Sequence, residues 1–163
     1  MGRVMNDLTH AFNPFWAMRR TFTGARIADI AKRFIGVHGE HYGRMTPPDE
    51  GLDTTGLIEA VAERLGEPLT LYRDWFVHGG ELNLLEIPVE DATPGDVLEF
   101  DFTEARRGRA LGYQLVILSF GQSALAKDAQ IVCVPHAVRI CWLDGLWRDH
   151  LRRAWRFNAR REP

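Results

Sequence analysis

Two stretches in the first half of the chain have the periodicity of amphipathic helices. Apolar residues recur at three- and four-residue spacing within 27–35 and again within 57–65. This spacing places them on one face of a helix. Gly36 and Gly66 follow the two stretches directly, as expected at helix ends. The sequence therefore predicts two helices, the second beginning near 53–55, joined by a loop rich in glycine and proline.

The second half of the chain changes to the pattern of strands. Apolar and polar residues alternate over 97–102, after a Thr-Pro-Gly-Asp turn, and mostly apolar runs follow at 111–120, 130–135 and 137–143. Short runs of this kind are typical of strands. Asp144-Gly145 fits a hairpin-type turn, and the last element, with Trp155 and Phe157, fits strand and helix equally. Helices followed by strands predict an α+β domain with an antiparallel sheet of about four to six strands.

The first residues differ from the rest, because their large apolar side chains follow neither a helical nor a strand period. Phe12, Phe15 and Trp16 stand among asparagine, proline and arginine residues. Such an arm either folds back on the domain or lies on a partner. We divide the chain into an N-terminal arm, 1–23, and one domain, 24–163, which is long enough to bury a core unaided.

Composition narrows the class of protein. With 163 residues, 45% apolar and 26% charged, the chain has the composition of a soluble globular domain. A net charge of -2 argues against binding nucleic acid through the whole surface. No stretch reaches the ~20 apolar residues that span a bilayer, and polar residues interrupt the N-terminus where a signal peptide is continuously apolar. We expect a cytoplasmic protein, unless it leaves the cell within a larger particle.

The charges are separated along the chain. Eight acidic residues and no lysine or arginine lie between Glu81 and Glu104, whereas six arginines lie between Leu146 and Pro163. Two interpretations stay open. The blocks form two solvated faces, or they dock electrostatically between subunits or onto a neighbouring protein.

Five motifs occur in a fixed order along the chain. They are Gly-Leu-Asp-Thr-Thr-Gly-Leu at 51–57, Pro-Gly-Asp-Val-Leu-Glu-Phe at 94–100, an apolar strand at 113–118, Val-Pro-His-Ala at 134–137 and Arg-Arg-Ala-Trp-Arg-Phe at 152–157. Together they resemble the phage and gene-transfer-agent branch of the NlpC-type cell-wall cysteine peptidases. The resemblance covers roughly residues 25–158 and implies a papain-like NlpC-type fold. It also implies that the chain is a tail-tip or baseplate protein. Members of that branch are thought to open peptidoglycan for DNA delivery.

The resemblance places the family's catalytic positions on residues that lack its chemistry. The nucleophile position is Thr54, the base position is Gln114, and only the third, orienting position keeps its type as His136. A cysteine at a helix N-terminus is favoured as the attacking thiolate. Threonine is far more basic, and glutamine has no basic nitrogen near neutral pH. We therefore predict a pseudo-enzyme with vestigial triad positions.

Thr54 and Gln114 also have ordinary structural interpretations. Thr54 suits helix capping. Gln114 either bonds Thr54 or His136, or is an ordinary polar residue of its strand.

Other candidate chemistry is weaker. Cys133, His136 and Cys141 have the residue types of a zinc site, but an extended strand turns His136 away from both cysteines. We interpret the cysteines as small core residues. His38 and His41 lie in a polar loop that explains them without a metal. We predict no metal and no cofactor.

The function we expect is structural. As a tail-tip or baseplate component, the chain contacts neighbouring tail proteins through the arm and the arginine-rich C-terminus, and binds neither nucleic acid nor membrane. Two rivals remain: an active peptidoglycan hydrolase, and a non-cleaving cell-wall binding module.

Overall fold

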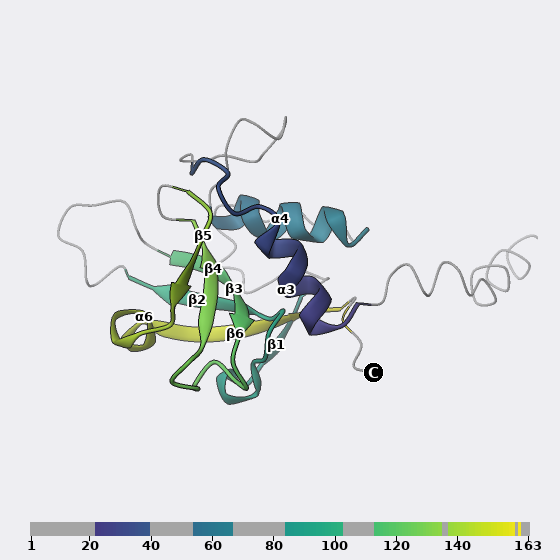
Figure 1. Cartoon of the computed structure of the whole chain (residues 1–163). Helices are drawn as coiled ribbons and strands as arrows, with labels where there is room; N and C mark the ends of the chain where they lie inside the picture. The colour runs from purple at the N-terminus through teal and green to yellow at the C-terminus, as the bar shows by residue number, and fades with distance from the viewer. Residues whose placement is uncertain are drawn as a thin grey trace, which may run out of the picture.

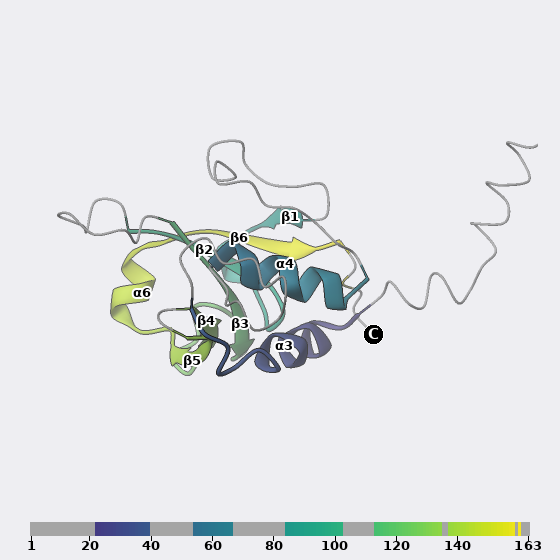
Figure 2. The same ribbon diagram turned by 90° about the horizontal axis from the view of Figure 1, so that it is seen from above.

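The fold is one antiparallel sheet covered on one face by two helices (Figures 1 and 2). The computed structural model describes residues 22–39, 54–66, 84–102, 113–134, 137–158 and 160. Within them the strand order is β1-β6-β2-β3-β4-β5, with every registered pair antiparallel. The elements are α3 (Gly24–Lys32), α4 (Thr54–Arg64), β1 (Leu84–Ile87), a 3-10 helix η1 (Val89–Asp91), β2 (Val97–Asp101), β3 (Tyr113–Phe120), β4 (Gln130–Cys133), β5 (Arg139–Trp142), α6 (Gly145–Asp149) and β6 (Leu151–Phe157).

Both predicted helices are present and pack on the central strand β3. The Thr23 side chain caps α3 by accepting the Arg26 N–H at 3.2 Å. The helix is shorter than its apolar pattern suggested, because it ends at Lys32 and the backbone continues in turns. Phe34 is still buried, but Ile35 is 45% exposed. The helices contribute apolar side chains such as Ile27 and Leu57 to a first core against one sheet face.

A second core covers the opposite face of the sheet. Alternate residues of β2 and β3, such as Phe100 and Val116, point into it. The short helix α6 closes it with Trp147, whose ring meets Phe100 edge-on at 4.9 Å between centroids. Burial on both faces explains why β2 is almost completely buried.

The predicted α+β class and antiparallel sheet are confirmed, and the undecided last element is a strand. The prediction of a hairpin-type turn at Asp144-Gly145 was wrong. Asp144 instead caps α6, accepting the Trp147 N–H at 3.4 Å, because an aspartate before a glycine serves a helix start as well as a turn. Strand β1 and helix α6 were not predicted from the sequence.

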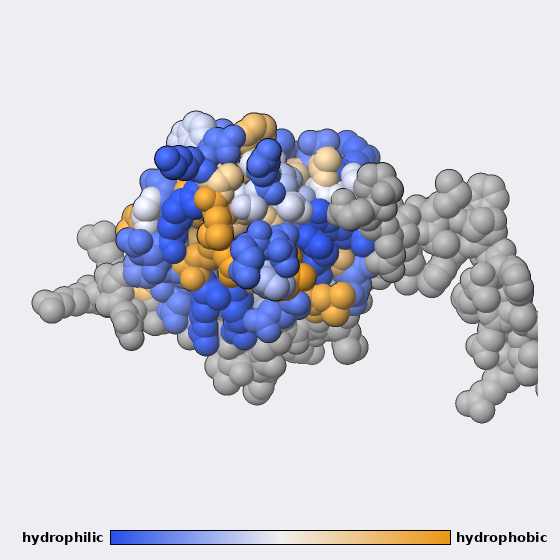
Figure 3. Space-filling model, turned by 90° about the horizontal axis from the view of Figure 1, so that it is seen from below, coloured by the Kyte–Doolittle hydropathy of each residue, from blue (hydrophilic) through white to orange (hydrophobic). Residues whose placement is uncertain are grey.

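The arm proposed for residues 1–23 is described only at its end. Phe22 packs against the first core, and its backbone forms an isolated parallel β-bridge with Arg160. Phe12, Phe15 and Trp16 lie outside the described residues. On the face viewed from below, apolar residues form small separate patches among hydrophilic ones (Figure 3). No helix in the described ranges is both long and apolar enough to cross a membrane.

Candidate functional site

The start of α4 is tied to the central strand by the side chain of Thr54. Its hydroxyl donates to the Leu115 carbonyl oxygen at 2.6 Å and accepts the Leu115 N–H at 2.5 Å. The two residues are 61 positions apart in the chain. We had predicted a helix cap at Thr54. The structure instead makes Thr54 the first residue of α4 and gives its hydroxyl a long-range partner.

The position of Leu115 in the sheet explains why a hydroxyl is needed there. Strand β3 pairs with β2 along 113–117, but its register with β4 begins only at Ile117. Leu115 therefore has a strand on one side and lies beyond the β4 register on the other. A backbone N–H and C=O left unpaired in such a place cost free energy. The Thr54 hydroxyl satisfies both groups, as a partner strand would.

Of the other two positions that the resemblance assigns, only Gln114 lies within the described residues. Leu115 and Ile117 belong to the core beneath the helices, whereas Val116 and Leu118 belong to the core on the opposite face. Strand alternation therefore places Gln114 on the face away from α4. His136 lies outside the described residues. One of the alternatives left open for Gln114 was a hydrogen bond with Thr54, but the Thr54 hydroxyl is bonded to the backbone of the next residue, Leu115.

The hydrogen bonds of Thr54 define what it can do chemically. A hydroxyl has one proton, and here that proton is directed at a carbonyl oxygen, which is not a base. To attack a peptide, the oxygen would have to lose this proton to a basic group and leave Leu115 unpaired. The arrangement suits a structural hydroxyl.

A stability series at Thr54 tests this role. Thr54→Val keeps the shape but removes both hydrogen bonds, and we expect it to lower the free energy of unfolding by about 1–3 kcal/mol because the Leu115 backbone groups lose their partner. Thr54→Ser keeps the hydroxyl and should lie close to the parent. Urea unfolding followed by circular dichroism measures both. Equal stability of the valine and serine variants would show that the hydroxyl is dispensable.

The Pro-Gly-Asp motif is held by two arginines from the C-terminal segment. The carboxylate of Asp96 is fully buried and accepts Arg156 at 2.7 and 3.0 Å and Arg160 at 2.8 Å. It also accepts the Thr93 N–H at 2.9 Å, which closes the turn. Arg160 donates further to the Pro94 carbonyl and the Thr93 hydroxyl. We call Asp96, Arg156 and Arg160 the turn clamp.

A second buried carboxylate lies beside Leu115. Glu99 is opposite Leu115 in the sheet register, and its fully buried side chain pairs with Arg153 at 2.5 Å. Burial raises the pKa of Glu99 although the Arg153 hydrogen bond and charge act to lower it. Strand alternation had suggested a polar strand face at this position. The arginine, 54 residues later, is what allows the carboxylate to be buried.

The acidic and basic blocks therefore pair with one another within the domain. Arg152 adds an exposed contact with Asp101 at 3.7 Å, whereas Arg148 donates to the Ala124 and Ala126 carbonyls, which lie outside the acidic block. Neither of the two interpretations drawn from the sequence included this pairing. The signal was present in the opposite signs of the two blocks, but only the neighbouring positions of β2 and β6 make them partners.

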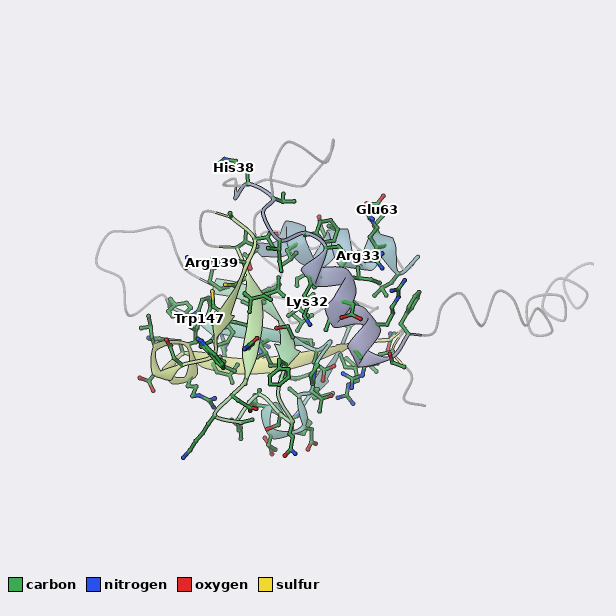
Figure 4. The ribbon with its side chains drawn as sticks, viewed as in Figure 1. Lys32, Arg33, His38, Glu63, Arg139 and Trp147 are labelled. Carbon is green, nitrogen blue, oxygen red and sulfur yellow. The ribbon has the colours of Figure 1, made fainter. Side chains whose placement is uncertain are left out.

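The remaining candidates have separate places. Cys133 and Cys141 face each other across β4 and β5, with the Sγ atoms 2.7 Å apart. His38 is exposed at the end of the segment after α3 (Figure 4), and His41 lies outside the described residues. The described ranges hold no group of three His, Cys, Asp or Glu residues suited to a metal ion.

A pocket opens at the far end of β3 from Thr54. It lies between α3 and the turn after β3, with Ala28, Lys32 and Phe120 in its lining. Neither Thr54 nor Gln114 contributes to it. This hollow is therefore separate from Thr54 and Gln114.

Comparison with solved structures identifies the fold. The chain is similar to a lipoprotein-like protein of the NLP/P60 family from Staphylococcus aureus (TM-score 0.59, 23% identity), to the NlpC/p60 domain of the peptidoglycan hydrolase SagA (0.57, 20%) and to NlpC2 of Trichomonas vaginalis (0.57, 17%). Each match covers 82% of this chain, but 41%, 97% and 46% of the other protein, respectively. No protein-family model and no curated protein sequence matches the chain. The expected papain-like NlpC-type fold is thus confirmed.

Proposed function

We propose that this chain is a non-catalytic domain of the NlpC/P60-type fold that serves as a structural component of a phage or gene-transfer-agent tail tip or baseplate. The observation that carries the non-catalytic part is the pair of hydrogen bonds between the Thr54 hydroxyl and the Leu115 backbone. They occupy the one proton of the residue at the nucleophile position. Gln114, at the base position, has no basic nitrogen and lies on the other face of the sheet.

The tail role is supported by the order of the five motifs and by the arm. That order resembles the tail-associated branch, and Phe12, Phe15 and Trp16 supply the large apolar groups that assembly contacts use. Such a component is made in the cytoplasm and leaves within the particle. Its partners are neighbouring tail proteins, reached through the arm and through parts of the arginine-rich segment that the clamp does not use.

The enzymatic part of the proposal is tested with purified peptidoglycan. We expect the parent protein to release no muropeptides above the buffer level, and Thr54→Val to behave identically, because neither protein can generate an attacking anion. The NlpC/p60 domain of SagA, a peptidoglycan hydrolase, is the positive control. Chromatography of the soluble fraction measures release.

Two outcomes would contradict this expectation. If the parent protein releases muropeptides and Thr54→Val does not, Thr54 is a nucleophile. If both proteins release them, another residue is the nucleophile. Co-sedimentation with intact cell walls, without release, would instead favour a module that binds cell walls without cleaving them.

The structural part is tested on particles from a producing strain. We expect the full chain to co-purify with tails through a density gradient, and a version beginning at residue 22 to fold but to be lost from them. Absence of the full chain from purified tails would overturn the tail assignment. Equal incorporation of both versions would remove the arm from the proposal.

A further inference from the structure

Cys133 on β4 and Cys141 on β5 are directed at one another. Their Sγ atoms lie 2.7 Å apart, a short movement from the ~2.0 Å of a disulfide bond. Cys133 is opposite Arg139 and Cys141 is opposite Ile131 in the register, so the two thiols are diagonal neighbours on one sheet face. Diagonal side chains on one face of a sheet remain within reach of each other.

We propose that Cys133 and Cys141 form a redox-active dithiol that closes to an intramolecular disulfide by exchange with a low-molecular-weight disulfide. The separation fits this bond better than a shared metal, since two thiolates on one zinc ion at ~2.3 Å each stand roughly 4 Å apart. The proposal is independent of whether the domain cleaves peptidoglycan.

The two thiols differ in access, and this sets their order of reaction. Cys133 is 1% exposed, while Cys141 is only partly buried. Burial raises the pKa of Cys133, which keeps it as a thiol. Arg139, an exposed residue of β5 (Figure 4), lies near the two thiols, and attraction to Cys141 raises the pKa of its guanidinium. Cys141 is therefore the attacking thiol and Cys133 the resolving one.

The exchange balances with oxidised glutathione as the oxidant. The Cys141 thiolate attacks one glutathione sulfur, the glutathione S–S bond breaks, and the first glutathione leaves as a thiolate that solvent protonates. Cys133 then loses its proton to solvent and attacks the Cys141 sulfur, expelling the second glutathione. Two protein thiols are oxidised and one glutathione disulfide is reduced to two thiols.

Closure links the edge strand β5 to β4 covalently. The nine-residue span from Cys133 to Cys141 contains position 136, the third of the vestigial triad. The bond would therefore fix the ends of the segment that carries His136. Its state should follow the redox poise of the compartment, because reducing cytoplasm and oxidising surroundings favour opposite forms.

Thiol counting on the full chain tests the proposal. The protein is incubated with oxidised or reduced glutathione, acid-quenched, alkylated and weighed by intact mass spectrometry. We expect two alkylated thiols after reduction, and none after oxidation with no bound glutathione. In Cys133→Ser, Cys141 should retain one glutathione, because its resolving partner is missing. In Cys141→Ser, Cys133 should react more slowly, on the order of tenfold, because it is buried.

Several results would overturn the proposal that Cys133 and Cys141 form a redox-active dithiol. These are two alkylated thiols at equilibrium with oxidised glutathione, a stable glutathione adduct on the parent chain, disulfide-linked dimers, or one zinc ion per chain that shields both thiols. The parent measurement needs no substitution, so it decides even if a serine variant fails to fold. Cys133→Ala offers a second test of trapping, since it keeps the site apolar.

Discussion

Replacing Asp96 by alanine should lower the free energy of unfolding by about 3–5 kcal/mol, the cost of removing one partner from a buried ion pair. The Asp96 carboxylate is fully buried, and the side chain of Arg160 is 6% exposed. Without the carboxylate, the buried Arg160 guanidinium loses its ion pair with Asp96 but keeps its hydrogen bonds to Pro94 and Thr93, and the Thr93 N–H loses its bond in the turn. The loss affects the turn, strand β2 and the C-terminal segment together.

The matched control is Asp101→Ala. Asp101 also pairs with an arginine of β6, but across 3.7 Å and with side chains 30% and 44% exposed. Exposed pairs of this kind contribute about 0–1 kcal/mol. Urea unfolding of the two variants should therefore differ by several kcal/mol although each removes one carboxylate. Similar losses in both would show that burial of the turn clamp adds nothing.

Asp96→Asn separates charge from shape. The amide keeps one oxygen acceptor but cannot offset the two guanidinium charges. The free energy of unfolding of Asp96→Asn should therefore fall between that of Asp96→Ala and that of the parent protein. A variant as stable as the parent would mean that the clamp depends on hydrogen bonds alone.

The elements that the sequence predicted well are those whose signal is local. The periodicity around Ile27 and Leu57 reports a helix face directly, because neighbouring turns of one helix share it. The apolar run of β3 is similarly clear. Asp144-Gly145 misled the prediction because one local pattern serves two structures, a turn and a capped helix.

The interactions of the site were harder to predict because their partners are remote in the chain. Thr54 was assigned a local cap, whereas its hydroxyl pairs with Leu115, 61 residues away. Glu99 looks solvent-facing until Arg153 is placed beside it by the insertion of β6 between β1 and β2. Sequence periodicity carries no information on such contacts. The opposite signs of the two charge blocks were a signal, but they were interpreted as solvated faces or as docking surfaces and not as partners within the domain.

Two glycines, Gly24 and Gly95, bring the start of α3 against the Pro-Gly-Asp turn, and alanine at Gly95 should be costly because it meets two obstacles at once. Gly95 has φ +98, and a Cβ there would lie 2.4 Å from the Gly24 carbonyl oxygen. A left-handed backbone costs an ordinary residue roughly 1–2 kcal/mol, and forced overpacking costs about 1–3 kcal/mol. We expect a combined loss of about 2–5 kcal/mol for Gly95→Ala.

Two other alanine substitutions separate these contributions. Gly36 has φ +93 with nothing within 4 Å of the added Cβ, so Gly36→Ala reports the backbone conformation alone. Gly24 is helical, but its Cβ would lie 2.1 Å from the Pro94 oxygen, so Gly24→Ala reports the close approach alone. Urea midpoints should rank Gly95→Ala lowest, with the other two above it. If Gly36→Ala costs as much as Gly95→Ala, the helix and the turn can separate freely, and the clamp at Asp96 would not need the close contact that these glycines permit.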